Sequence, residues 1–162
     1  MSSDSSNEAW RGIEKGWVSG QLAHAYLLKG SPQGAAKRFS DKMLRLVFHD
    51  HAQVQTRTHP DIQWLEPQSK SRQIGIDEIR DVIRQLSQTS FSGGWKASVI
   101  LCADRMTEQA ANALLKTLEE PAPHTLLILV TDEPQSLLPT ISSRCQRITL
   151  ADSDEDTFVQ WK

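Results

Sequence analysis

One segment of the chain lies where a phosphate-binding loop would be expected. The turn Gly30–Gly34 follows a short apolar run and precedes residues with helical spacing. In the pattern G-x-x-x-x-G-K-[ST], the glycines let backbone amides face a phosphate, the lysine reaches the outer phosphates and the hydroxyl holds magnesium. With Gly30 as the first glycine, these last three positions are Ala35, Ala36 and Lys37. We therefore interpret the loop as degenerate.

Lys37 does not replace the missing lysine, because a shift of one residue turns a helical side chain by about 100°. The favoured interpretation is that Gly30 and Gly34 serve the geometry of a turn between strand and helix, and that no cofactor binds. A weaker alternative stays open, in which the start of the helix binds a nucleotide or another anion.

The acidic residues of an ATPase are also missing from their usual place. Such an enzyme needs carboxylates at the end of the third strand, to hold magnesium and activate water. Here that strand ends in Leu101 and Cys102, and Asp104 follows two residues later. We expect Asp104 to cap a turn or to be solvated. An active ATPase that uses Lys37 and Asp104 is a second interpretation, so enzymatic activity stays an open question.

Alternating apolar and helical segments must position these residues. Short apolar runs without polar alternation predict strands that are buried on both faces, and the segments between them predict helices. We expect an α/β fold with a parallel sheet, whose ligands would lie beyond the carboxyl ends of the strands, at residues 30–34, 102–106 and 131–134. Residues 49–58 are polar and irregular. The predicted strands are 24–29, 61–65, 97–102, 125–131 and 146–150, and the predicted helices are 7–18, 35–48, 76–86 and 107–119, with a further short helix within 137–144.

Three sequence segments carry a resemblance to a known family. Residues 111–121 read ANALLKTLEEP, residues 143–145 read SRC, and residues 21–26 read QLAHAY. Together with His59-Pro60-Asp61, these segments resemble the bacterial clamp-loader subunits of DNA polymerase III, members of the AAA+ superfamily. The resemblance covers about residues 10–150. It implies a three-layer, P-loop NTPase-like sandwich with a five-stranded parallel sheet.

The resemblance also implies roles for individual residues. The chain is similar to the delta-prime branch of that family, which has lost nucleotide hydrolysis but keeps the Ser-Arg-Cys segment. Arg144, between Ser143 and Cys145, would be an arginine finger, a guanidinium offered to ATP on a neighbouring subunit. Thr131 occupies the position of the family's polar sensor residue. The implied partners are gamma- or tau-type ATPase and delta subunits and, through the complex, the sliding clamp and primed DNA.

Polar residues outside these segments raise the question of two further ligands, a metal ion and a nucleic acid. Relatives carry a cysteine-rich zinc module, but residues 49–58 contain no cysteine. Although His49, His51 and His59 lie in or next to this segment, structural zinc sites usually include thiolates, so we expect no metal. A nucleic-acid binder is a third interpretation of the chain. It would use the basic residues of one helix, Lys37, Arg38, Lys42 and Arg45.

Length and composition fit one globular domain. The chain has 162 residues, of which 38% are hydrophobic and 23% charged, with a formal net charge of −2. It has no apolar run long enough to cross a membrane, no signal-like start and only two cysteines, so we expect a cytoplasmic protein. We divide it into a flexible tail (1–9, with Met1 to Asn7 frayed), a nucleotide-binding-fold domain (10–151) and the start of a truncated lid region (152–162), whose acids between 152 and 156 begin a helix.

Overall fold

The fold is a five-stranded parallel sheet between two layers of helices. The computed structural model describes residues 2–49, 51–69 and 72–151. The strand order is β2-β3-β4-β1-β5, and every neighbouring pair is parallel. This confirms the predicted α/β fold class. The strands are β1 (Ala25–Lys29), β2 (Ile62–Leu65), β3 (Lys96–Leu101), β4 (Thr125–Thr131) and β5 (Gln146–Thr149).

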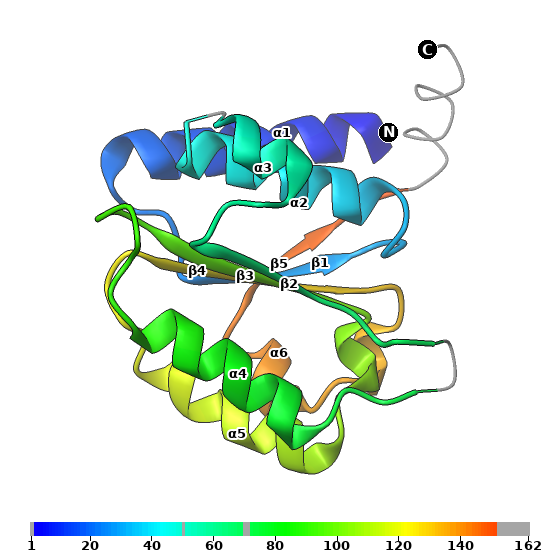
Figure 1. The fold of residues 1–162 in the computed structure, drawn as a ribbon. Helices are drawn as coiled ribbons and strands as arrows, with labels where there is room; N and C mark the ends of the chain where they lie inside the picture. The colour runs from blue at the N-terminus through cyan, green and yellow to red at the C-terminus, as the bar shows by residue number, and fades with distance from the viewer. Residues whose placement is uncertain (1, 50, 70–71, 152–162) are drawn as a thin grey trace.

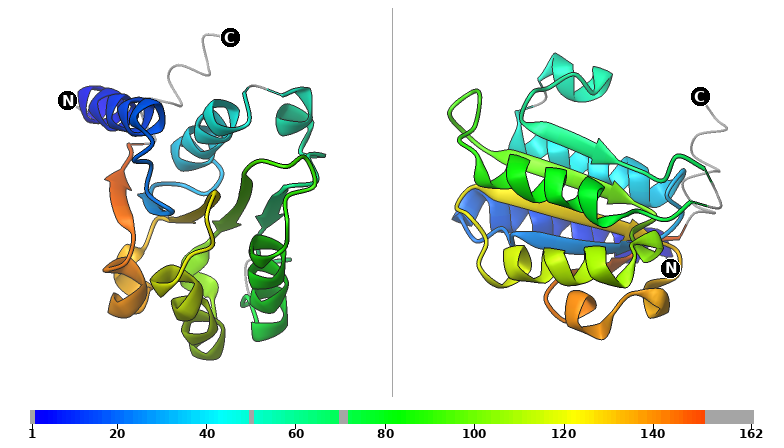
Figure 2. Two further views of the ribbon diagram at one scale, coloured as in Figure 1. Left: turned by 90° about the vertical axis from the view of Figure 1, so that its left-hand side faces the viewer. Right: turned by 60° about the horizontal axis from the view of Figure 1, so that its bottom comes forward.

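The helices are divided between the two faces of the sheet. Helices α1, α2 and α3 lie on one face, and α4, α5 and α6 lie on the other (Figure 1). Figure 2 shows the same two layers from the side and from below. The α-helices are α1 (Ser2–Ser19), α2 (Ala35–Val47), α3 (Ala52–Thr56), α4 (Ile76–Ser87), α5 (Glu108–Glu119) and α6 (Pro139–Ser142), and single 3-10 turns are η1 (Ala103–Arg105) and η2 (Pro134–Ser136).

Two hydrophobic cores explain why the strands are apolar throughout. Along β4, Leu126, Ile128 and Val130 belong to the core that contains residues of α1, α2 and α3. The intervening Leu127 and Leu129 belong to the core that contains residues of α4, α5 and α6. Since successive strand residues point to opposite faces, a sheet covered on both sides needs apolar residues at every position. All seven residues of β4 are buried.

Helix α1 corrects the prediction of a frayed N-terminal tail, because it begins at Ser2 rather than near residue 7. Residues 2–9 contain no glycine or proline, so no residue in this segment interrupts a helix that extends back to Ser2. The helix is held to α2 by aromatic contacts. Trp10 packs edge-on against Phe39 at 5.7 Å between ring centroids, and the Lys42 ammonium lies 4.4 Å above the Trp10 ring.

The other differences concern short helices. Residues 49–58 are not wholly irregular, since they contain the one-turn helix α3, whose N-cap His51 accepts a hydrogen bond from the Gln53 amide. Only Val54 of this helix is buried, so it has no apolar period to detect. Helix α6 confirms the short helix predicted within residues 137–144; it spans four residues, with Pro139 in its first turn. The helix expected from residue 152 lies outside the described residues.

The loop between α4 and β3 is attached to the sheet by Asp61. This residue is only 1% exposed. Its carboxylate accepts hydrogen bonds from the Ser90 hydroxyl (2.9 Å), the Phe91 amide (2.6 Å), and the amide and hydroxyl of Ser92 (3.0 and 2.7 Å). Burial by itself would raise the pKa of Asp61, but the hydrogen bonds from Phe91, Ser92 and Ser90 outweigh it and lower the pKa to about 2.

No helix within residues 2–49, 51–69 and 72–151 is both long enough and apolar enough to cross a membrane.

Candidate functional site

The loop at the end of β1 turns its amides toward its own oxygen atoms. The Gly34 amide donates to the Ser31 carbonyl at 3.0 Å, and the Gln33 amide donates to the Ser31 hydroxyl at 3.3 Å. The Gly30 amide donates to the Thr131 carbonyl at 3.0 Å and so extends the pairing of β1 with β4. A phosphate loop needs its amides to face the ligand. The loop therefore resembles an ordinary strand-to-helix turn.

Gly30 is needed for close packing at the start of α2. A Cβ atom at this position would lie 3.1 Å from the Cβ of Ala36 and 3.4 Å from the Leu150 carbonyl oxygen. Ala36 occupies the position of the lysine in the phosphate-loop pattern and is fully buried, whereas Lys37 lies on a partly exposed part of the helix. Because Ala36 has a small side chain and Gly30 has none, the first turn of α2 can lie close to the sheet.

Thr131 and Asp104 meet at the carboxyl ends of neighbouring strands. Thr131 is fully buried, and its hydroxyl donates to the Asp104 carboxylate at 2.6 Å. The same hydroxyl accepts the Glu133 amide at 2.9 Å. Asp104, in η1, therefore accepts a specific bond, a role that the sequence did not indicate. The Thr131 hydroxyl uses its proton on Asp104, so its geometry favours a structural role over ligand sensing.

Thr131→Val tests this structural role. The valine has a similar shape but leaves the Asp104 carboxylate without its donor and the Glu133 amide without its acceptor. We expect the free energy of unfolding to fall by about 1–3 kcal/mol in urea denaturation. Thr149→Val, at an exposed position of β5, is the matched control and should leave the midpoint nearly unchanged. Equal stability of the two variants would show that the Thr131 bonds contribute nothing.

The Ser143-Arg144-Cys145 segment presents its arginine at the surface. The Arg144 side chain is 37% exposed and lies 3.6 Å from the Glu119 carboxylate. Its guanidinium also donates to the Thr140 carbonyl at 2.8 Å. Ser143 is exposed, whereas Cys145 packs against the core beneath α6. Burial raises the pKa of the Cys145 thiol to about 11, so Cys145 has a packing role and not that of a nucleophile.

Arg144 and the loop at Gly30 lie at opposite edges of the sheet. Arg144 lies two residues before the first residue of β5, and Gly30 directly follows β1, which pairs in parallel with β5. Strands of four or five residues separate the two edges by roughly 13–17 Å at about 3.3 Å per residue. Arg144 therefore lies on the surface, away from the loop at Gly30 of its own chain.

The histidines next to α3 do not gather into a metal site. The rings of His51 and His59 lie 5.4 Å apart between centroids. The Nδ1 atom of His51 accepts the Gln53 amide, and that of His59 accepts the Asp61 amide. His49 instead lies against the Trp17 ring. In the described part of the chain, no group of three potential metal ligands is found.

The basic residues of α2 are mixed with other groups rather than forming a separate face. Lys42 lies over Trp10, and both Arg38 and Arg45 interact within the chain. Burial raises the pKa of Asp41, and the opposite effects of Arg57, Arg45 and Lys37 show that these cations surround its carboxylate. This arrangement gives no support to a nucleic-acid site on α2.

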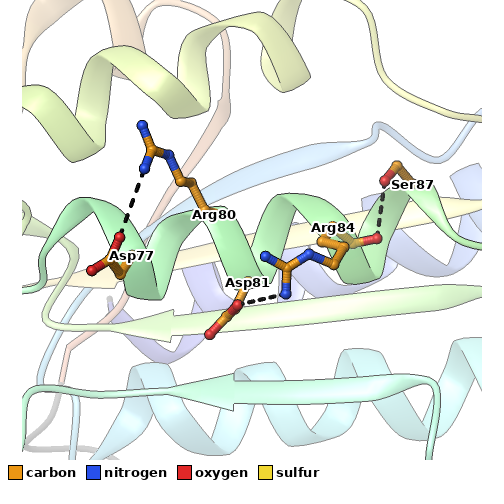
Figure 3. A network of polar contacts seen from close by, with 5 residues as sticks. All are labelled: Asp77, Arg80, Asp81, Arg84 and Ser87. Atoms are coloured by element: carbon orange, nitrogen blue, oxygen red, sulfur yellow. Dashed lines mark hydrogen bonds and ion pairs between the residues drawn. The ribbon is translucent and has the colours of Figure 1, made fainter.

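Helix α4 shows a similar pairing of charges. Arg80 lies 3.7 Å from the Asp77 carboxylate, and Arg84 lies 2.9 Å from that of Asp81 (Figure 3). All four side chains are more than half exposed, so these pairs add little to stability. They do balance the positive charge along the helix.

Comparison with known proteins identifies the family. Residues 5–154 match the family described as "DNA polymerase III, delta subunit". The chain belongs to this family. It is 38% identical to the DNA polymerase III subunit delta′ of Escherichia coli over 136 residues, which are 84% of this chain and 39% of that protein. It is 43% identical to the subunit delta′ of Haemophilus influenzae over 108 residues, or 67% of this chain and 33% of that one.

The delta-subunit family relatives are longer than this chain, which spans between one third and about two fifths of their length. Among solved structures, a DNA polymerase III gamma subunit-related protein of Thermotoga maritima is similar with a TM-score of 0.66 and 30% identity, over 80% of this chain and 41% of that one. The RuvB branch migration motor of the same organism, at 14% identity and a TM-score of 0.58 over 91% of this chain and 44% of that one, shares the fold. The resemblance seen in the sequence is thus confirmed.

Proposed function

We propose that this chain is the nucleotide-binding-fold part of a delta-prime-type subunit of the bacterial DNA polymerase III clamp loader. In this proposal it does not hydrolyse ATP itself. It supplies Arg144 as an arginine finger to the ATP bound by a neighbouring gamma- or tau-type subunit while the complex loads a sliding clamp onto primed DNA. Ser143 and Cys145 position the arginine, and the function is carried out in the cytoplasm.

The observation that carries the proposal is the position of Arg144. A guanidinium is permanently charged and can bind two phosphate oxygens at once, which suits it to stabilise phosphoryl transfer. Arg144 lies on the surface at the edge of the sheet opposite Gly30. Its contact with Glu119 is a surface ion pair, which costs little to exchange for a phosphate on a partner.

The experiment that tests the finger is ATP hydrolysis by a reconstituted clamp loader that contains either the wild-type chain or Arg144→Ala. The non-hydrolysing role is supported by the loop after β1, because the Gln33 and Gly34 amides already donate to Ser31 rather than toward a ligand. The partner subunits, delta, the clamp and primed DNA belong to the same proposal.

Mg-ATP binding is the direct test of the degenerate loop. Isothermal titration of this chain with Mg-ATP is expected to give no measurable heat at tens of micromolar protein, because the loop has no lysine at position 36 and the Gln33 and Gly34 amides already donate to Ser31. A gamma-type ATPase subunit serves as the positive control. One-to-one binding that Lys37→Ala weakens would instead favour an active ATPase that uses Lys37 and Asp104.

A further inference from the structure

A small cavity opens at the amino edge of the sheet, on the face covered by α4 and α5. Its volume is about 230 Å³. It lies between the C-terminal end of α4, the loop that follows it and the turn that precedes β4, away from the loop at Gly30. The lining residues that matter here are Ser87, Gln88, Thr89, Lys96, His124 and Thr125.

Lys96 is the unusual member of this lining. It is the first residue of β3 and only 5% exposed. Strand alternation places it on the same face as Ile100, which belongs to the core beneath α4 and α5. Within the described residues, its ammonium has no hydrogen bond or ion pair to another side chain or carbonyl. Although the residue as a whole is buried, its ammonium is not fully shielded from solvent, so it can meet a ligand that enters the cavity.

Asp61, the buried carboxylate just before the neighbouring strand β2, does not supply that counter-charge. Its oxygens accept the four hydrogen bonds from Ser90, Phe91 and Ser92 described above. Among the described residues, no aspartate or glutamate lines the cavity. The electrostatic preference of the cavity is therefore set by Lys96.

Some of the remaining lining side chains already donate a hydrogen bond within the protein, and others do not. The hydroxyls of Ser87 and Thr125 already donate, to the Arg84 and Ala122 carbonyls (Figure 3 shows the first of these). By contrast, no bond is made by the Gln88 side-chain amide or the Thr89 hydroxyl within the described residues. Two neutral donors thus accompany the Lys96 ammonium.

We propose that this cavity binds a phosphate group, held by Lys96 with Gln88, Thr89 and His124 as further donors. A phosphate group has a negative charge and several oxygen atoms that accept hydrogen bonds. It therefore matches a site that combines one ammonium with neutral hydrogen-bond donors. The cavity is smaller than the roughly 300 Å³ at which pockets for whole drug-sized ligands begin. It therefore takes the phosphate and not the base and sugar of a nucleotide. The site is independent of the function proposed for Arg144.

The test is a titration of the 162-residue chain, followed residue by residue by amide NMR, with inorganic phosphate in one arm and an unphosphorylated single-stranded oligothymidylate in the other. Phosphate is expected to shift the amides of Thr89, Lys96 and His124 in a saturable manner. Lys96→Met should weaken this binding at least about tenfold. Lys116→Met, on the exposed face of α5, is the matched control and should bind as the wild type does.

A second variant separates ligand binding from folding. His124 has a left-handed backbone (φ 57°), a conformation that asparagine tolerates, so His124→Asn removes the imidazole with little strain. Weaker phosphate binding by a folded His124→Asn or Lys96→Met chain supports the site. Oligothymidylate binding that phosphate competes away identifies a nucleic-acid backbone as the source, and phosphate binding alone identifies a free phosphate compound. Absence of saturable shifts, or equal binding by Lys96→Met, would overturn the proposal.

Discussion

Replacing Arg144 by alanine is expected to slow ATP hydrolysis at the neighbouring site by about 10³-fold or more, the usual effect of losing an arginine finger. The physical reason is that no other charge from this chain is expected to stabilise the transferring phosphoryl group. The measurement is single-turnover hydrolysis in a reconstituted clamp loader whose only intact ATP site is the one that faces this chain. Other intact sites would otherwise hide the loss.

Two control variants make this result specific. Arg144→Lys keeps the charge but loses the two-pronged geometry, so its rate should lie between wild type and Arg144→Ala. Arg147→Ala removes another exposed arginine, in β5, and should hydrolyse normally. Because the contact of Arg144 with Glu119 is a surface ion pair, all variants should keep the wild-type melting temperature. Normal hydrolysis by a complex containing Arg144→Ala would exclude the finger.

Replacing Asp61 by alanine is expected to give the largest loss of stability. The change removes the acceptor of four hydrogen bonds and leaves the amides of Phe91 and Ser92 without their partner. We expect the free energy of unfolding to fall by about 2–4 kcal/mol, measured by urea denaturation at neutral pH. Asp77→Ala is the matched control, since its side chain is 94% exposed and its loss should change stability by less than about 0.5 kcal/mol.

The same carboxylate predicts how stability depends on pH. The pKa of Asp61 falls from an ordinary 3.8 to about 2 on folding, a difference that corresponds to about 2.5 kcal/mol. Because the folded-state pKa is lower, this stabilisation is complete above about pH 5 and is lost as the pH falls from about 4 through 2. Asp61→Ala should therefore have a flatter stability profile in this interval than wild type. Parallel profiles would show that Asp61 is not the group responsible.

The fold was predictable because its central strands carry an unambiguous pattern. The continuous apolar runs of β3 and β4 allow only burial on both faces, and Thr107, the N-cap of α5, with Pro121 just after that helix, located the clearest helix closely. Helix α3 was missed because Val54 alone is buried, and the start of α1 was predicted too late because its serines are typical of a tail. Local composition decides such short or terminal helices less strongly than packing does.

Those parts of the candidate site that depend on the order of residues along the chain, or on family resemblance, could be predicted from the sequence. The order of residues from Gly30 to Lys37 was sufficient to indicate a degenerate loop, and family resemblance indicated Arg144. The bond between Thr131 and Asp104 and the burial of Lys96 could not be predicted. Each depends on which strands are neighbours in the sheet, here β3 beside β4 and β2 beside β3, and a single sequence does not specify that order.

Arg144 and Gly30 lie at opposite ends of the parallel strands, so the two ends of this domain present different surfaces. In a head-to-tail assembly, the amino edge of one such sheet faces the carboxyl edge of the next, and each contact repeats the same two unlike surfaces. In the function proposed for this chain, the domain donates an arginine at one edge and binds no nucleotide at the other, so it can make only one of these two contacts. It would therefore occupy one end of such a series, because no further subunit could repeat the contact there.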